Sequence, residues 1–436
     1  MEPDDLSGRS VAVVGSGVAG LVAAHVLSRR NRVTLFEADT RLGGHAHTHT
    51  IDRGDGTVVA VDSAFLVHND RTYPTLCRLF AELGIETHDT DMSMSVRDDR
   101  AHLEYAGARG IGGLFPSPAN LSRPRYLRML LEVRRFHREA TELLATAAGT
   151  AEADETLGSF VGRHGFSPYF VAHFMTPLVA AVWSCAPADA MSYPARYLFV
   201  FLQHHGMLSV FGSPTWRTVV GGSATYVDAI ARGIHEVSLG TPVRSVARVP
   251  GGVDVAAGDA SARRFDAAVI ATHPDQALRL LAAPTAAQRS VLGAISYSTN
   301  HTQLHTDESV LPRRPRARAS WNYLATPDTG NVVVTYDITR LMGLAGPERY
   351  LVTLGGKDRV DPATVIAEMT YEHPLYTPES VAAQSLLPTF DDDLLTFAGA
   401  YHGWGFHEDG AASGVRAAER LGARWTTTTE LESVPC

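Results

Sequence analysis

Three glycines near the N-terminus have the spacing of a turn that binds the diphosphate of a dinucleotide. They lie in the segment Gly15-Ser-Gly17-Val-Ala-Gly20. In such a turn the first glycine makes the tight bend, the second lets backbone N–H groups approach a diphosphate, and the third lets the following helix pack closely on the strand. The diphosphate then lies at the positive end of that helix. Val18 and Ala19, in the same turn, are therefore expected to contact the cofactor as well.

A carboxylate follows this turn at the distance that dinucleotide binding requires. Glu37 comes 22 positions after Gly15 and can accept hydrogen bonds from the hydroxyls of a ribose. This favours an adenosine ribose without a 2′-phosphate. These residues do not by themselves distinguish FAD from NAD, and a glycine turn without a ligand is the alternative interpretation.

The elements that would position these groups can be read from the apolar pattern. Residues 10–14 form a nearly continuous apolar run, residues 21–29 have helical spacing, and residues 32–36 form a second apolar run. Such runs are typical of parallel strands that are covered on both faces. The order strand, helix, strand and acidic residue predicts a Rossmann-like unit at the start of the chain.

Three further segments resemble motifs of FAD-binding proteins and therefore favour FAD over NAD. Residues 37–45, with Arg41 and a second glycine pair, resemble the second motif of the FAD-dependent amine oxidase and phytoene desaturase superfamily. Residues 397–415 resemble its late segment, in which a turn lies against the flavin and a helix start faces the cofactor. Residues 241–274 resemble its return to the cofactor domain, with Val243 near the adenine. The resemblance implies non-covalent FAD and contacts at Ala38, Arg41, Gly43, Gly44, His45, Val243, Gly405, Glu408, Asp409, Gly410 and Ser413.

A narrower resemblance covers nearly the whole chain up to about residue 422. Segments 61–70, 216–223, 304–307 and 319–323 are similar to a bacterial subgroup of predicted NAD/FAD-binding proteins. That subgroup is often linked with fatty-acid-modifying enzymes, which implies a lipid-like substrate.

These patterns predict an α/β fold in which a Rossmann-like FAD-binding domain of the GR2 type is interleaved with an α+β substrate-binding domain. The FAD-binding domain is expected at residues 8–75, 215–275 and 390–422. The substrate domain is expected at 76–214 and 276–389, and 423–436 is expected to be a disordered tail.

Several residues are candidates for the chemistry beside the flavin. Lys357 is the only lysine and occurs in a hydrophilic turn, which argues against an amine oxidase that uses a lysine. His45, His47 and His49 alternate, so on a strand they would share one face; they could line the cofactor site, form polar surface or bind a metal. We expect no metal. The catalytic candidates are His45, His205, Tyr323 and Tyr401, and Trp321 and Trp404 could also enclose the substrate.

Two stretches without Asp, Glu, Lys or Arg, residues 164–188 and 197–216, would give the substrate domain an apolar lining. We therefore expect an FAD-dependent oxidoreductase that desaturates a lipid-like or polyene substrate, with hydride transfer to flavin N5 in a dry site. The alternatives are a redox-neutral isomerase of C=C bonds, an amine oxidase, and a flavin-binding protein without turnover.

Composition limits the partners and the compartment. The net charge of −9 argues against nucleic acid, and three scattered cysteines argue against a disulfide framework or a zinc site. The acidic N-terminus does not look like a signal peptide, so a cytoplasmic protein is expected. Residues 123–147 form an arginine-rich amphipathic pattern. This is a solvated helix face or a contact with a membrane surface or an acyl carrier protein. The oligomeric state is left open.

Overall fold

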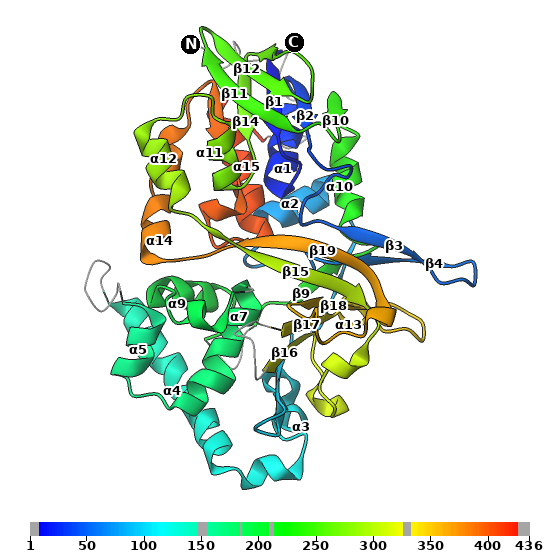
Figure 1. Cartoon of the computed structure of the whole chain (residues 1–436), viewed down its shortest axis with the longest axis vertical. Helices are drawn as coiled ribbons and strands as arrows, with labels where there is room; N and C mark the ends of the chain where they lie inside the picture. Colours follow the sequence, from blue (N-terminus) through cyan, green and yellow to red (C-terminus); the bar gives the residue numbers. More distant parts are fainter. Residues whose placement is uncertain (1–7, 147–154, 184, 209–212, 326–332, 426–436) are drawn as a thin grey trace.

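The computed structural model describes residues 8–146, 155–183, 185–208, 213–325 and 333–425. Its two halves are stacked along the long axis of the molecule, and the described ends of the chain lie together at one tip (Figure 1). Three segments that are far apart in the sequence build the half containing both ends. The chain therefore passes between the halves several times, which confirms the interleaved α/β architecture.

The half that contains both chain ends is organised around a five-stranded parallel sheet. Its strands, in spatial order, are β10 (Glu236–Ser238), β2 (Arg32–Phe36), β1 (Ser10–Val14), β14 (Ala267–Ile270) and β20 (Leu395–Phe397). Val13 is in register with Leu35 on one side and with Val269 on the other. These central strands are almost fully buried because both faces of the sheet are covered.

Helices cover one face of this sheet, and a small antiparallel sheet with further helices covers the other. The first face carries α1 (Val18–Leu27), α15 (His407–Arg420), α2 (Pro74–Leu83) and α10 (Ala224–Ala231). The second carries β11 (Val243–Val249), β12 (Gly252–Ala257), β13 (Arg263–Phe265), α11 (Pro274–Leu280), α12 (Ala286–Gly293) and α14 (Pro378–Gln384).

The other half contains a seven-stranded mixed sheet and a group of helices. The strands, in spatial order, are β19 (Val365–Pro374), β15 (Tyr297–His305), β18 (Leu351–Leu354), β17 (Val333–Asp337), β16 (Trp321–Ala325), β7 (Met94–Asp98) and β8 (Leu103–Ala106). The helices are α3 (Gly110–Leu114), α4 (Pro124–Ala145), α5 (Leu157–Arg163), α6 (Pro168–Phe170), α7 (Thr176–Trp183), α8 (Pro187–Ala190), α9 (Ala195–His204) and α13 (Ile338–Leu341). The long strands β15 and β19 lie side by side where the two halves meet (Figure 1).

Short strands complete the junction between the halves. They are β3 (Thr48–Asp52), β4 (Val58–Asp62), β5 (His68–Asn69), β6 (Thr87–Asp89) and β9 (Trp216–Val219). The first uncharged stretch runs through α6 and α7, and its apolar side chains are largely buried, as the sequence predicts. Among the described residues, none of the helices is both long enough and apolar enough to span a bilayer.

Packing moves the expected domain boundaries. Helices α12 and α14, which were assigned to the substrate domain, pack with Val14 and Phe36 of the parallel sheet because their apolar faces complete the same core. Helix α2 packs on α15 and therefore also belongs to the cofactor half. The expected disordered tail begins too early: Trp425 is buried, and its indole N–H donates to Glu82 at 2.8 Å. Residues 426–436 lie outside the described residues.

Candidate active site

A cavity of about 620 Å³ runs through the junction of the two halves. Its wall includes the glycine turn after β1 and also the side chain of Trp321 on β16. The cavity therefore passes from the cofactor half into the substrate half. A volume of this size is typical of sites for small molecules and cofactors.

The glycine turn forms the first part of the cavity wall. Gly15 has a φ of 98°, and a Cβ added there would lie 2.7 Å from the carbonyl oxygen of Ala271. A Cβ added to Gly20 would lie 1.9 Å from the carbonyl oxygen of Gly15, so only glycine permits this contact between helix and turn. Gly17 is the N-cap of α1 and has no side-chain cap. The free N–H groups of the first helical turn can therefore bind an anionic diphosphate.

Glu37, directly after β2, lies in the cavity wall with its carboxylate fixed by the backbone. One oxygen accepts hydrogen bonds from the amide of Ser16 at 2.9 Å and from the Ser16 hydroxyl, and the other accepts from the amide of Asp39 at 2.8 Å. The remaining lone pairs of this carboxylate can accept hydrogen bonds from ribose hydroxyls. Ala38 and Val243 line the cavity beside it. The glycine spacing does not predict the role of Ser16, whose amide and hydroxyl donate hydrogen bonds from the glycine turn to Glu37.

The second glycine pair is tied to the first turn. The amide of Gly43 donates to the carbonyl oxygen of Ser16 at 3.1 Å, and Gly44 lines the cavity. Arg41, expected at the cofactor phosphates, does not line the cavity. Its guanidinium donates to the carbonyl oxygens of Leu42 and Ala46 at 3.3 and 3.5 Å. Arg41 therefore supports the loop that carries the glycines.

The late segment reaches the same cavity from the other end of the chain. Gly405, Phe406 and His407, at the start of α15, line its wall. Helix α15 lies directly against α1, since a Cβ added to Gly414 would lie 2.3 Å from the carbonyl oxygen of Ala19. The starts of two helices thus converge on one cavity.

Three of the four residues expected to contact the cofactor from α15 instead bond with their side chains to the surrounding backbone. Glu408 accepts hydrogen bonds from the amides of Thr75 and Leu76 and so caps α2. Asp409 accepts from the amide of Phe406 at 2.9 Å, and burial raises the pKa of its carboxyl to about 7. Ser413 bonds to the backbone of Gly399 and Gly410. None of Glu408, Asp409, Gly410 and Ser413 lines the cavity, and neither do Gly20 and Gly43.

The alternating histidines do not share one face, because β3 begins only at Thr48. His45 lines the cavity, with its ring 5.0 Å from that of Tyr371. His47 does not line the cavity. Its Nδ1 lies 2.9 Å from the hydroxyl of Tyr371, and its ring is tilted against that of His49 with the centroids 4.1 Å apart. Burial holds the pKa of His45 well below its usual value, so its imidazole is neutral. In the described part of the chain, no group of three or more His, Cys, Asp or Glu side chains could hold a metal ion.

His205 lies in the cavity wall within the substrate half, at the C-terminal end of α9. Its Nδ1 lies 2.9 Å from the carbonyl oxygen of Phe201, and because a carbonyl can only accept, Nδ1 carries the proton. Burial lowers the pKa of His205 to about 4. Its ring is stacked on Trp216 at 6.0 Å. Nε2 is therefore left as an unprotonated acceptor among aromatic side chains.

The four aromatic candidates divide into two pairs. Trp321 and Tyr401 line the cavity, whereas Tyr323 and Trp404 do not. The hydroxyl of Tyr401 is buried without a hydrogen-bond partner, and burial raises its pKa. Lys357 lies in an exposed turn outside the cavity wall.

Further cavity residues escaped the sequence analysis. They are Phe65, Tyr73, Trp183, Phe201, Tyr297, Tyr371, Glu372 and His373. Glu372 bonds to His273, the N-cap of α11, at 3.0 Å. Phe65 lies within segment 61–70, so the family resemblance could have indicated it. Residues 371–373 lie more than 300 positions after the glycine turn, and no sequence spacing links them to that turn.

The residues present fit an FAD molecule. Gly17 leaves open space above the start of α1, and a fixed carboxylate lies beside it. His45 and Tyr401 line the cavity, and Nε2 of His45 and the hydroxyl of Tyr401 are buried polar atoms without a partner in the described protein. A cofactor with phosphates, ribose and a polar ring system would supply these missing partners.

Comparison with known proteins identifies the family. The model of the flavin containing amine oxidoreductase family matches residues 18–361. The chain belongs to this family of FAD-dependent oxidoreductases. FAD is accordingly its cofactor, and the matched region includes the start of α1 and most of the substrate half.

Individual relatives are distant. The chain is 26% identical to (S)-6-hydroxynicotine oxidase of Paenarthrobacter nicotinovorans over 64% of this chain and 63% of the relative. It is 29% identical to the carotenoid phi-ring synthase of Streptomyces griseus over 63% of this chain and 54% of that protein. The matched regions thus span less than two thirds of these relatives. The crystal structure of a CLA-producing fatty acid isomerase from P. acnes has a TM-score of 0.68 at 15% identity, covering 97% of this chain and 99% of that one, which shows the same fold.

Proposed function

We propose that the protein desaturates a hydrophobic, lipid-like or polyene substrate. The observation that carries this proposal is the lining of the cavity within the substrate half. Away from the cofactor half the side chains are apolar or aromatic apart from His205. They are Met92, Val182, Trp183, Phe201, His205, Met207, Trp216, Trp321, Tyr336 and Leu354. The carboxylate that the seven-stranded sheet adds to the wall, Glu372 at the end of β19, is bonded to His273 on the cofactor side at 3.0 Å.

Such a lining excludes water and holds an extended apolar chain by burial of its surface. An alkylammonium substrate would require a compensating acceptor when it is desolvated, and the carboxylate of Glu372, which β19 adds to the wall, is already bonded to His273. The absence of lysine from the described cavity wall is a second observation that disfavours lysine-assisted amine oxidation.

FAD supplies the acceptor for the hydride, at N5 of its ring system. The protein residues supply the remaining conditions. Nε2 of His205 accepts the proton from the neighbouring carbon, so that one C–H bond loses a hydride, the other loses a proton and a C=C bond forms. Trp216 and Phe201 keep this histidine neutral by burying it, and Trp183 and Trp321 restrict the path of the substrate.

Anaerobic mixing of the FAD-bound protein with single lipids tests this proposal. The panel comprises unsaturated fatty acids, their esters and linear polyenes. We expect loss of the oxidised-flavin absorbance with one lipid class and a product that is lighter by two hydrogens. Absence of bleaching across the panel would contradict desaturation.

The same mixtures distinguish the alternative functions. A product of unchanged mass, formed only with reduced flavin, indicates an isomerase of C=C bonds. Release of hydrogen peroxide with simple amines indicates an amine oxidase. Binding of lipids without any turnover indicates a flavin-dependent binding protein.

A further inference from the structure

The end of the molecule farthest from the two chain ends carries an unusual set of exposed apolar side chains. Ile111 is 80% exposed, Leu121 59%, Leu127 37% and Leu131 68%. These four residues, here called the apolar tip, are four of the nine large hydrophobic side chains that are exposed in the described part of the chain. They fall within 21 consecutive residues of α3, the 3₁₀ turn Pro118–Ser122 and the start of α4. Exposed apolar side chains gathered in one part of the fold are typical of an interaction surface.

The segments that carry the apolar tip form one supported structure. The hydroxyl of Tyr126 on α4 donates to the carbonyl oxygen of Leu114 on α3 at 2.7 Å. The side-chain amide of Asn120 donates to the carbonyl oxygens of Leu114 and Glu104 at 3.3 and 3.0 Å. The apolar side chains are therefore presented outward by a framework that is itself hydrogen-bonded.

Arginines surround the apolar tip. On α4, Leu127 and Leu131 share the exposed face with Arg128, Arg134 and Arg138, which follow at helical spacing. A second chain segment adds Arg313, Arg314 and Arg316, all exposed. This segment packs on α3, since a Cβ added to Gly112 would lie 3.9 Å from Cδ of Arg316.

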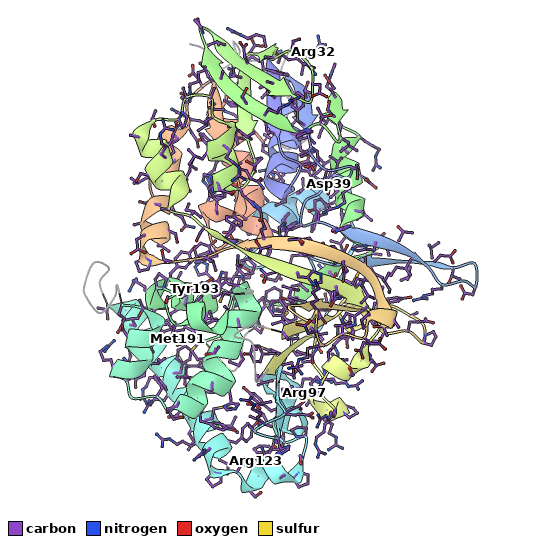
Figure 2. All side chains as sticks on the ribbon, in the orientation of Figure 1. Arg32, Asp39, Arg97, Arg123, Met191 and Tyr193 are labelled. Carbon is purple, nitrogen blue, oxygen red and sulfur yellow. The ribbon has the colours of Figure 1, made fainter. Side chains whose placement is uncertain are left out.

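Most of the acidic groups near these arginines are already engaged. Asp99 pairs with Arg97 and Arg313, Asp91 pairs with Arg109, and the carboxylate of Glu104 accepts hydrogen bonds from the amides of Arg313 and Arg314. Arg125, Arg314 and Arg316 form no ion pair with any Asp or Glu in the described ranges. Arg128, Arg138 and Arg313 are paired with Glu132, Glu139 and Asp99, so the excess positive charge at this end of a chain with a net charge of −9 comes from arginines such as Arg125, Arg314 and Arg316. Figure 2 shows Arg123 at this extremity and Arg32 at the opposite one.

We propose that this surface docks the protein on an anionic phospholipid bilayer. Guanidinium groups bind lipid phosphates with paired hydrogen bonds, and apolar side chains at the same level enter the boundary between headgroups and acyl chains. A second copy of the chain fits poorly, because a symmetric dimer would bring two sets of arginines together. Nucleic acid fits poorly as well, because the apolar tip contains leucine and isoleucine and no aromatic side chain for base stacking.

Co-sedimentation of the full-length, FAD-bound protein with vesicles tests this docking. The vesicles contain phosphatidylcholine alone or phosphatidylcholine mixed with phosphatidylglycerol. We expect binding to the anionic vesicles that weakens with added salt, and little binding to the neutral ones. Because no substrate is present, the result is independent of the proposed reaction.

Variants with matched controls separate the contribution of the arginines to vesicle binding from that of the apolar side chains. The triple variant Arg125→Glu, Arg314→Glu, Arg316→Glu is expected to reduce the partition coefficient on the order of 100-fold, from about fivefold per arginine. The double variant Ile111→Ser, Leu131→Ser is expected to reduce the partition coefficient on the anionic vesicles on the order of tenfold. The controls are Arg32→Glu at the opposite end and Leu386→Ser, an apolar position on the cofactor half that is 49% exposed. FAD absorbance verifies that each variant is folded.

Two results would overturn the proposal. One is equal binding of the wild type to neutral and anionic vesicles with no response to the triple variant. The other is failure to bind vesicles at all, including the case in which a purified acyl carrier protein binds the same arginines instead.

Discussion

The two halves of the cavity are built from different kinds of chemical group. In the cofactor half the wall is mainly backbone: the glycine turn, the second glycine pair and the start of α15 present amides and leave space for a ligand. In the substrate half the wall is mainly side chains, contributed by α7, α9, β16, β17 and β18 together with Trp216 of β9 at the junction. A backbone site tolerates little change in sequence, whereas a side-chain wall can be rebuilt residue by residue for another substrate. The cofactor should therefore be common to the family, and the substrate particular to this chain.

The change Gly20→Ala tests the backbone side of this comparison and should have the largest effect. Because the new Cβ would lie 1.9 Å from a backbone oxygen, the turn or the helix must move. We expect purified protein without bound FAD and a free energy of unfolding lower by at least about 3 kcal/mol. Absorbance spectra and denaturant titration measure both.

Gly162→Ala is the matched control for this change. Gly162 lies in α5 with no atom within 4 Å of its Cβ position. We expect normal FAD content and a gain in stability of roughly 0.5–1 kcal/mol. Equal behaviour of the two variants would show that the glycine contacts do not form the site.

The change His205→Gln tests the part of the cavity wall that side chains of the substrate half form. The variant keeps a polar group of similar length but loses the unprotonated Nε2. We expect FAD binding within twofold of the wild type and a kcat lower on the order of 100-fold. Tyr323→Phe is the control, because Tyr323 lies outside the cavity wall, and its kcat should be unchanged. A His205→Gln variant with wild-type kcat would exclude this histidine as the proton acceptor.

Acid should destabilise both halves together. Burial lowers the pKa of His205 and His373 to about 4 and of His407 to about 3. In the unfolded chain these groups take up protons near pH 6.5, so their contribution to stability is present above that pH and is lost as the pH falls towards 4. Buried Asp62 and Asp409, whose pKa values are raised to about 6 and about 7, change stability in the opposite direction over much of this range.

The histidines should dominate because more of them are strongly shifted. The other described histidines whose pKa falls to about 3 or 4 are His47, His68, His305 and His402. We expect the free energy of unfolding to fall by about 2 kcal/mol between pH 6.5 and 4.5. Denaturant titrations at several pH values measure this, and stability that is constant or rises towards pH 4.5 would contradict it.

The change Glu37→Gln should produce the smallest of these effects. One carboxylate oxygen becomes an NH₂ group that faces the amide of Ser16 or of Asp39, so that one hydrogen bond is lost and the ribose acceptor is weakened. We expect the Kd for FAD to rise about tenfold, with kcat unchanged at saturating FAD. Glu236→Gln is the control: Glu236 bonds to Arg263 outside the cavity, so affinity should not change.

The difference between a backbone wall in the cofactor half and a side-chain wall in the substrate half also explains which features the sequence predicts. The strand, glycine turn and acidic residue at positions 10–37 are contiguous, and each residue type there has a local physical reason. They predict the Rossmann-like unit and the place of Glu37. The family resemblance extends this prediction to the late segment, although Glu408 and Asp409 bond to the backbone instead of lining the cavity.

For the substrate half, the sequence predicts that the cavity lining is apolar but not which residues form most of it. The uncharged stretches indicate an apolar lining, and His205 was found because it lies within one of them. Tyr371 and His373 come from a strand whose position depends on the packing of the whole seven-stranded sheet. Trp321 and Tyr323 are two positions apart on β16 and so share one face of the strand, and only the packing around the strand decides that Trp321 and not Tyr323 lines the cavity.

The close contact between α1 and α15 has a consequence for biosynthesis. The two helices come from opposite ends of the polypeptide, and β20 joins the parallel sheet only near the end as well. During translation the ribosome therefore releases α15, whose start lines the cofactor cavity, long after the glycine turn. Until then the first βαβ unit lacks its neighbour, and its apolar surface remains uncovered. A chain that stops before residue 395 should accumulate as a colourless, aggregation-prone product.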